Sequence, residues 1–539
     1  MKRNMKRGIA FAMLILSMGA RAFAQNVILL IPDGMSVAGT TLARFYKGES
    51  LALDEIACGL VSTWNSDGTI ADSAPAGSAF ATGWTSQTGN VASLGTLYLL
   101  PGVEVPAGDA KSPAATILEA ARLSGRSTGI ISTSEFMHAT PADFSGHDPS
   151  RSNYDNLTEQ IVYNGLNVIL GGGTPYLNAA ARKDKEDMKA ILAERGYTYV
   201  DNASDLRAFR GGDRLVGTFG KTKASTAMSY DLDRDSGNEP SLARMTAKAI
   251  EILSANPKGF FLMVEGSKVD WAAHANDPVA LVTDIIAFDD AVKVALDFAK
   301  KDGNTVLIAA TDHGNSGISI GDRSISSGYD KTPWTTFINP LKRASLTGEG
   351  LEAMLPVRTS DSAGAQAIRE AVARYMGISD LTDAEVAAIA GAKAGSVNYA
   401  IGPAVAARAK IGFTTNGHTG EDVVLYNYDP FGKRISGLVK NTDLAAYMAA
   451  TMKVDLAAST SRLFKDAASL FAKKGASISV DAADPENPVL VVVKGDQTLR
   501  IPRNKSIVSL NGKTMDSDGV TVFNGVKWFV AENVIDLIQ

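Results

Sequence analysis

Short apolar runs alternate with amphipathic helical patterns through the first two thirds of this 539-residue chain, and this alternation constrains the fold more than any other feature. Five such runs, each flanked by Gly, Asp, Ser or Thr, lie at residues 27–31, 128–131, 167–170, 260–264 and 305–310. Helical patterns such as 113–123 and 240–255 separate them. This order indicates βαβ units. We therefore predict an α/β fold, a three-layer sandwich with helices on both faces of a mostly parallel central sheet.

Two later segments break the pattern. Residues 316–411 are irregular, contain Pro333 and Pro340, and include a capping box at 382–385 that opens one of two helical pieces. We predict that they form a crown-like insertion over one side of the sheet. Residues 476–539 are β-rich with Asn-Gly turns, which indicates a small C-terminal β-rich domain beside a main domain of residues 25–470.

The N-terminus has the pattern of an export signal. Residues 1–24 contain a basic stretch, a short apolar stretch and a small-residue cleavage site, and no other run is long enough for a membrane helix. Removing five basic residues and no acidic one changes the formal net charge from -5 to -10. We predict an exported protein, periplasmic or extracellular, that does not bind nucleic acid through its net charge. Because Cys58 is the single cysteine, no intrachain disulfide can form.

Polar residues follow three of the apolar runs directly. Asp33 follows the first, Glu265 and Asp270 follow the fourth, and Asp312 and His313 follow the fifth. A single acid in such a place is more often a helix cap or turn residue. Ligands, however, gather at the carboxyl ends of parallel strands. Three strands that end alike therefore favour a shared site.

Three of the five histidines lie in contexts typical of metal ligands. His274 follows Asp270 by four residues, His313 follows Asp312 directly, and His418 lies in a Gly-His-Thr-Gly segment. A scattered histidine is usually a surface or core residue. Nitrogen and oxygen ligands without thiolate are nevertheless typical of catalytic zinc. The spacing favours a dinuclear site.

A candidate nucleophile lies in residues 72–83, which read Asp-Ser-Ala-Pro-Ala-Gly-Ser-Ala-Phe-Ala-Thr-Gly. Pro75 suits the first turn of a helix, and small residues let that helix pack closely. Ser73 would then lie at a helix N-terminus, where free N–H groups and the dipole favour phosphate. The alternative is an ordinary Ser/Ala-rich turn and helix.

These segments together resemble the alkaline phosphatases, in order and over roughly residues 25–470. The similar segments are 26–35, 72–83, 139–142 followed by Arg151, 264–274, 310–313 and 417–420. The resemblance implies hydrolysis of phosphate monoesters through a phosphoserine at Ser73, with Arg151 gripping the phosphate. It also implies two zinc ions and a third ion, usually magnesium. The implied ligand sets are, in that order, Asp270, His274 and His418; Asp33, Asp312 and His313; and Asp33, Thr140 and Glu265.

Two positions depart from the best-known bacterial pattern of that family. His138 stands where that pattern has aspartate, and Trp271 stands where it has lysine. Both positions are implied to lie near the substrate phosphate, so the departures put the identity of the third metal in doubt. The C-terminal domain resembles the small N-terminal β domain of some copper amine oxidases. It carries no metal-ligand cluster, and we expect it to be removable without loss of a site residue.

Two other functions remain open on sequence alone. The same scaffold could hydrolyse phosphodiesters, phosphonates or sulfate esters, although Gly77 stands where a sulfatase would have arginine. A metal- or phosphate-capturing protein without turnover would need no nucleophile, so Ser73→Ala would leave its affinity intact. A homodimer and cell-surface attachment through the C-terminal domain also remain open.

Overall fold

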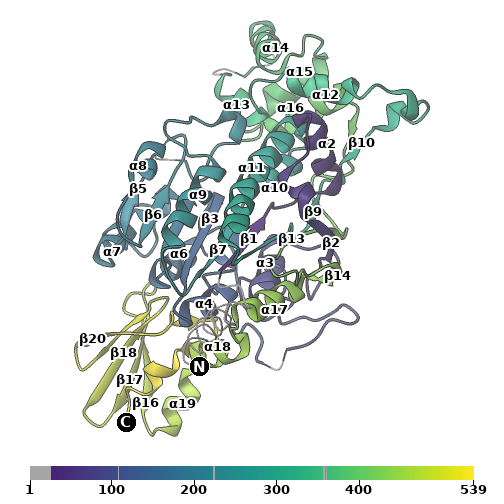
Figure 1. Cartoon of the computed structure of the whole chain (residues 1–539). Helices are drawn as coiled ribbons and strands as arrows, with labels where there is room; N and C mark the ends of the chain where they lie inside the picture. The colour runs from purple at the N-terminus through teal and green to yellow at the C-terminus, as the bar shows by residue number, and fades with distance from the viewer. Residues whose placement is uncertain (1–25, 107, 223–224, 356–357, 360) are drawn as a thin grey trace, which may run out of the picture.

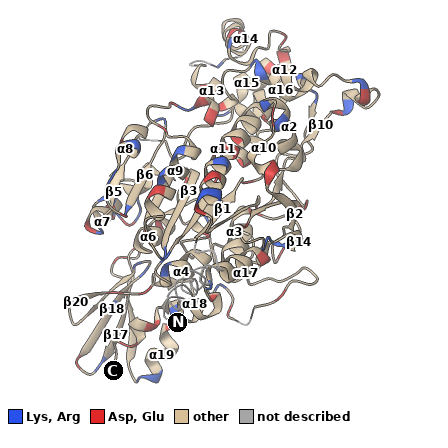
Figure 2. Ribbon diagram, in the orientation of Figure 1, with Lys and Arg blue, Asp and Glu red and all other residues tan. Residues whose placement is uncertain are grey.

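The computed structural model describes residues 26–539 except 107, 223–224, 356–357 and 360. Residues 1–24, predicted as a signal segment, lie outside the described residues. Among the described residues, every helix is too short or too polar to cross a bilayer. Lysine and arginine are interspersed with aspartate and glutamate on the described helices and loops, whereas the strands of the central sheet carry few charges (Figure 2).

A central sheet of ten strands runs through the described chain. In spatial order the strands are β14 (Gly437–Lys440), β2 (Ala57–Ser62), β13 (Val423–Tyr428), β8 (Thr305–Ala309), β1 (Asn26–Ile31), β7 (Phe260–Glu265), β3 (Ser127–Glu135), β4 (Val168–Gly172), β6 (Leu215–Thr218) and β5 (Thr198–Val200). All neighbours from β8 to β5 are parallel, and β13 runs antiparallel between β8 and β2. The predicted parallel-rich sheet is confirmed, and its five predicted strands are β1, β3, β4, β7 and β8.

Strand β1 shows why the sheet needs helices on both faces. Ile28 and Leu30 belong to one hydrophobic core, whereas Val27, Leu29 and Ile31 belong to another. Helices α2 (Val37–Lys47), α9 (Leu242–Leu253) and α11 (Pro278–Asp302) contribute to the first core. Helices α3 (Ser73–Thr82), α4 (Ile117–Leu123), α6 (Tyr154–Tyr163) and α17 (Asn441–Met452) contribute to the second. This is the predicted three-layer sandwich (Figure 1).

The insertion lies at one end of the molecule, at the top of Figure 1. It contains α12 (Thr335–Lys342), α13 (Gly348–Ala353), α14 (Ser362–Met376), α15 (Asp383–Gly391) and α16 (Asn398–Arg408). The predicted capping box at the start of α15 is confirmed. The Thr382 hydroxyl accepts a hydrogen bond from the Glu385 amide at 3.2 Å, and the Glu385 carboxylate accepts one from the Thr382 amide at 2.8 Å.

The C-terminal β region lies at the opposite end (Figure 1). Strands β16 (Ser477–Asp481), β17 (Val489–Lys494), β18 (Gln497–Pro502), β19 (Ile507–Leu510) and β20 (Lys513–Asp516) form an antiparallel sheet. Strands β21 (Val522–Phe523) and β22 (Trp528–Val530) instead join β15 (Lys465–Asp466). The core of this region includes Ala467 and Phe471 of α19 (Ala467–Lys473). Its packing therefore begins before residue 476.

Candidate active site

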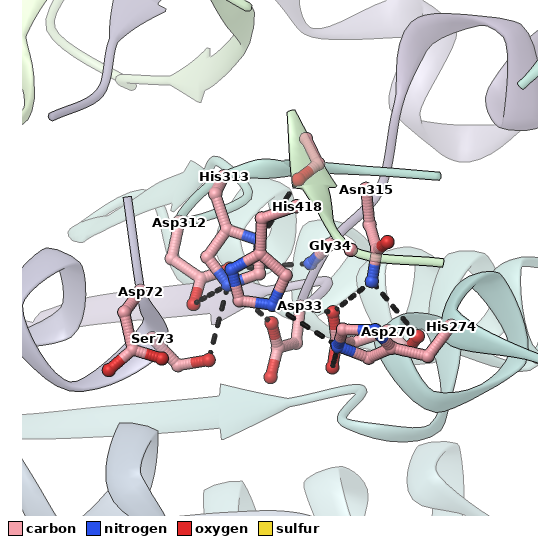
Figure 3. A network of polar contacts seen from close by, with 12 residues as sticks. Asp33, Gly34, Asp72, Ser73, Asp270, His274, Asp312, His313, Asn315 and His418 are labelled. Atoms are coloured by element: carbon pink, nitrogen blue, oxygen red, sulfur yellow. Dashed lines mark hydrogen bonds and ion pairs between the residues drawn. The ribbon is translucent and has the colours of Figure 1, made fainter. Parts of the chain in front are cut away.

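The site forms where β1, β7 and β8 end. Asp33 follows β1, Asp312 and His313 follow β8, and α10 (Lys268–His274) follows β7. The short strand β12 (His418–Thr419) pairs antiparallel with β9 (Gly314–Asn315) and brings His418 to the same place. Figure 3 shows these side chains pointing toward one another.

Gly34 allows the loop after β1 to approach α10. Its φ is +67°, and a Cβ there would lie 2.5 Å from Asp270 Oδ1. A side chain at this position would meet both backbone strain and a steric clash. The glycine therefore lets Asp33 and Asp270 enter one site.

The first group of ligand atoms comprises Asp33, Asp312 and His313, which are all fully buried. His313 Nε2 lies 3.4 Å from Asp33 Oδ1 and 3.3 Å from Asp312 Oδ2. Burial, followed by the charges of Asp312, Asp270 and Glu265, raises the pKa of Asp33 well above its usual range. The three side chains have the N and O donors that zinc uses in catalytic sites.

The second group comprises Asp270, His274 and His418. Asp270 Oδ2 lies 3.3 Å from His274 Nε2, and Oδ1 lies 3.6 Å from His418 Nε2. Burial opposes ionisation of Asp270, but the hydrogen bond from His274 and the neighbouring histidine charges lower its pKa. The rings of His313 and His418 stack at 3.6 Å, so the two groups adjoin. Asp270, His313 and His418 also form a compact triad.

Backbone carbonyls orient all three histidines. His274 Nδ1 lies 2.6 Å from the Asn416 carbonyl, His313 Nδ1 lies 3.2 Å from that of Gly314, and His418 Nδ1 lies 2.8 Å from that of Ala71. A ring that donates through Nδ1 presents Nε2 as the free ligand nitrogen. Each Nε2 therefore faces the carboxylates.

Glu265, the last residue of β7, and Thr140, in the short helix α5 (Ala139–Ala142) after β3, adjoin the first group. Burial raises the pKa of Glu265 to about 8, and the charge of Asp312 contributes to the rise. Within the described structure, several buried oxygens have no hydrogen-bond partner: both of Asp33, Asp312 Oδ2, Glu265 Oε1 and Thr140 Oγ1. Buried carboxylates are normally paired or bound to metal. These unsatisfied oxygens fit divalent cations.

Ser73 is the first residue of α3, as predicted, and is 2% exposed. Its Oγ lies 3.1 Å from His313 Nε2 (Figure 3). Helix α3 packs closely against Asp143 because its residues are small: a Cβ on Gly77 would lie 2.3 Å from Asp143 Oδ2. The hydroxyl is therefore held beside the first ligand group.

Arg151 contacts Asp72, the residue directly before Ser73, and the motifs did not single out Asp72. Arg151 Nη1 donates to Asp72 Oδ1 at 2.5 Å, and Nη2 lies 3.4 Å from His138 Nε2. Asp72 is the N-cap of α3 but makes no side-chain cap hydrogen bond. Its place directly before Ser73 was the available sequence signal.

His138 and Trp271, the two positions that depart from the best-known bacterial pattern, are neighbours. Their ring centroids are 6.0 Å apart. Burial, and then the charge of Arg151, lowers the pKa of His138 to about 3, so this imidazole is neutral. Lys268 Nζ lies 4.3 Å from the Trp271 ring centroid. Trp271 is uncharged, but the lysine ammonium group places a positive charge next to it.

One further residue, Asn315, belongs to the site, and one histidine does not. Asn315 donates to Asp270 Oδ1 at 2.7 Å and to its carbonyl at 3.3 Å, a role that no sequence signal indicated. The remaining histidine, His147, is buried against Glu119 with Nε2 3.0 Å from Oε1. It belongs to the core and not to the site.

A parallel-rich α/β sheet with a buried serine beside clustered histidines and carboxylates defines a metal-dependent ester hydrolase. The model of the family described as alkaline phosphatase matches residues 24–454. The chain belongs to the alkaline phosphatase family, whose general reaction is the hydrolysis of phosphate monoesters. It is thus a phosphatase.

Named relatives agree with this assignment. The chain is 33% identical over 440 residues to alkaline phosphatase 3 of Bacillus subtilis, covering 78% of this chain and 87% of that protein. It is 31% identical to the repressible alkaline phosphatase of Saccharomyces cerevisiae, covering 75% and 76%. Among solved structures, the alkaline phosphatase of Thermus thermophilus is similar with a TM-score of 0.70 and 26% identity, covering 81% and 92%. A cold-active alkaline phosphatase from Shewanella sp. gives 0.67 and 26%, covering 79% and 99%.

Proposed function

We propose that this phosphatase transfers the phosphoryl group of a monoester to Ser73 and then to water, with two zinc ions and one magnesium ion. The observation that carries the proposal is the 3.1 Å contact between Ser73 Oγ and His313 Nε2 at the edge of the buried ligand cluster. Asp270, His274 and His418 would hold one zinc ion, and Asp33, Asp312 and His313 the other.

Magnesium would be held by Asp33, Thr140 and Glu265, whose oxygens suit a hard cation. A solved mutant of the TAB5 alkaline phosphatase in which glutamate replaces a histidine, 23% identical to this chain, has Mg bound in its M3 site. When bound, these cations would supply Lewis-acid stabilisation of the attacking and leaving oxygens. They would also offset the repulsion among the buried carboxylates.

Ser73 Oγ attacks phosphorus, the bond to the leaving alcohol breaks, and a phosphoserine forms. Water then attacks that phosphorus from the vacated side, which releases inorganic phosphate and restores the hydroxyl. The N-terminus of α3 favours the phosphate through its free N–H groups and dipole. Each phosphoryl transfer thus occurs beside the same helix end.

Arg151 binds two phosphate oxygens in a planar, bidentate manner that lysine cannot reproduce. Asp72 and the neutral His138 contact the two ends of its guanidinium, which supports this orientation. The charge of Arg151 and a third metal site suit the dianion of a monoester better than the single charge of a diester. We also propose that the enzyme acts after export, on the basis of the pattern in residues 1–24.

Ser73→Ala tests the covalent step. We expect turnover of p-nitrophenyl phosphate to fall by several orders of magnitude while zinc content stays unchanged, because no ligand set includes Ser73. Acid-quenched parent enzyme should carry phosphate on the peptide containing Ser73, as detected by mass spectrometry. Ser78→Ala, on the same helix, is the matched control, since Ser78 donates to Asp143 and lies outside both ligand groups. Near-normal turnover of the Ser73 variant would contradict the proposal.

A further inference from the structure

A cavity lies between the catalytic body and the C-terminal β region, and it is lined mainly by polar side chains. Its volume is about 490 Å³. Arg122, Arg195 and Arg214 from the body line it, and Ser506 and Ser517 line it from the C-terminal region. Three guanidiniums thus line one cavity.

This cavity is separate from the active site, because the cavity lies at the amino ends of the parallel strands and the active site lies at their carboxyl ends. Arg122 in α4 precedes β3, Arg195 precedes β5, and Arg214 precedes β6, so all three lie at the amino ends of strands. The catalytic residues follow the carboxyl ends of β1, β7 and β8. In Figure 1 the C-terminal sheet lies below α4, α6 and α7 (Met188–Glu194).

The three guanidiniums donate to neutral acceptors in the described structure. Arg122 Nη2 donates to the Asp518 carbonyl at 2.5 Å, and Arg214 Nη1 to the Arg195 carbonyl at 3.1 Å. Arg195 Nη2 donates to the Tyr163 carbonyl at 3.1 Å and to Ser506 Oγ at 3.4 Å. These contacts leave the positive charges without a bound carboxylate.

Two of these arginines also have unused donors. The Nε atoms of Arg122 and Arg195 are buried and have no hydrogen-bond partner among the described residues. Burial lowers the pKa of Arg122, although the charges of Glu119 and Asp518 oppose the fall. Buried charges and buried donors are costly unless they are paired. An anion in the cavity would offset the cost of the buried charge, whereas these two Nε atoms are too enclosed to contact it.

The carboxylates in the cavity wall do not fill this role. Glu194 and Asp516 line the cavity, but both are exposed, and neither forms an ion pair with the three arginines in the described structure. Asp518, which is near Arg122, directs its carboxylate to Arg462 at 2.7 Å. The arginine donors therefore remain available to a ligand.

We propose that this cavity binds a small oxyanion with at least two negative charges, a phosphate ion or the phosphoryl group of a small molecule. Arginine recognises such groups through paired N–H donors, and the serine hydroxyls would add neutral contacts. The ligand would contact both the body and the C-terminal region, so binding would stabilise their junction.

Equilibrium dialysis of the full-length, metal-loaded enzyme with inorganic phosphate tests the site by stoichiometry. We expect two phosphate ions per parent chain, one in the active site and one in the cavity. The double variant Arg122→Gln/Arg195→Gln should bind one, with kcat/KM for p-nitrophenyl phosphate unchanged. Arg374→Gln, an exposed arginine of the insertion, should bind two. One ion per parent chain, or two per double variant, would overturn the proposal.

A milder variant keeps the test decisive if the double variant fails to fold. Arg214→Gln should weaken the second site at least about tenfold and leave the first unchanged. If the second site binds phosphate as tightly in this variant as in the parent, the proposal is overturned. Competition separates the two sources of the ligand: displacement by sulfate alone indicates a free ion, and displacement by methylphosphonate as well indicates a phosphorylated molecule. If neither displaces the second phosphate, the oxyanion site is rejected.

Discussion

Arg151 shows how a single side chain can be positioned before substrate arrives. Its guanidinium already contacts Asp72 and His138, so little conformational freedom remains to be lost when phosphate binds. Burial opposes its charge, but Asp72 raises the pKa of Arg151 above its usual value. The side chain is therefore a permanent cation beside Ser73.

We expect Arg151→Ala to weaken product inhibition as well as catalysis. Each charge-assisted hydrogen bond contributes roughly 1.5–3 kcal/mol, so losing two should change both constants by about 100-fold or more. The measurements are the inhibition constant of inorganic phosphate and kcat/KM. Arg151→Lys is the matched control, since it keeps the charge without the planar fork and should recover part of the loss. Unchanged phosphate inhibition would show that Arg151 does not hold the phosphate.

His138 offers a second prediction at the residue scale. Its buried Nδ1 has no partner among the described residues, and its ring is neutral. A carboxylate there would add negative charge near the proposed magnesium ligands and suit a hard cation better than imidazole does. We expect His138→Asp to tighten magnesium binding on the order of tenfold.

Titration of magnesium into metal-depleted protein measures this effect. His138→Asn is the control, because it has nearly the same shape as aspartate and lacks the charge. Equal magnesium affinity in parent and His138→Asp would place His138 too far from the third metal to matter.

At the scale of elements, the strands that carry the site were predictable because they are buried on both faces. Such strands read as continuous apolar runs, and a polar residue after the run marks the sheet edge. The pairing of β12 with β9 was not predictable, since each has two residues and no periodic pattern. Local sequence therefore indicated His418 as a ligand but not the element that delivers it. Asp72 and Asn315 depend on long-range contacts in the same way.

Helix α6 connects the C-terminal region to the loop that bears Arg151. Asn504 donates to Asn156 at 3.2 Å and to Glu159 at 3.0 Å. Asn156 in turn donates to Asp148 at 3.0 Å, and Asp148 accepts from the Ser150 amide at 2.9 Å. The last of these contacts is next to Arg151 in sequence.

The hydrophobic core crosses the same junction. Val520, Val522 and Phe529 belong to the core that also contains Leu463 and Phe464 of the body. From the sequence we expected a removable domain, because all motifs precede it. Motif order carries no information about packing, and this shared core changes the expectation.

We expect a chain ending at Lys474 to be less stable by several kcal/mol, since each exposed large apolar side chain costs about 1.5–3 kcal/mol. Its kcat/KM should also fall, because α6 loses its contacts with Asn504. Thermal unfolding and steady-state kinetics measure the two effects. Asn504→Gly in the full chain separates them, since it removes the hydrogen bonds without exposing the core and glycine tolerates the left-handed φ of +64° at this position. A truncated enzyme with parental stability and activity would show that the region is only an appendage.

At the scale of the whole molecule, the insertion and the C-terminal β region occupy opposite ends of the sandwich (Figure 1). The junction with the C-terminal region buries charge as well as apolar surface. Glu159 is nearly fully buried and lies 3.3 Å from Lys505 Nζ, and Lys505 also pairs with Glu186. A buried ion pair of this kind makes the stability of the junction depend on pH.

Burial, with the charge of Glu186 acting in the same direction, raises the pKa of Glu159 from 4.5 to about 7, although Lys505 opposes the rise. A carboxyl whose pKa is higher in the folded state binds protons more tightly there. It therefore stabilises the fold in acid, and this contribution is lost as the pH rises from about 4.5 through 7. Glu159→Gln fixes the neutral state, so it should match the parent below pH 4.5 and exceed it in stability above pH 7.

The gain above pH 7 should be roughly 3 kcal/mol, which corresponds to the rise in the pKa from 4.5 to about 7 and already includes the opposing charge of Lys505. The shift in thermal midpoint at pH 4 and pH 8 measures it. Glu251→Gln, which removes an exposed partner of Lys248, should show no comparable difference between the two pH values. Lower stability of Glu159→Gln than of the parent at pH 8 would mean that attraction to Lys505 outweighs the cost of burying the carboxylate.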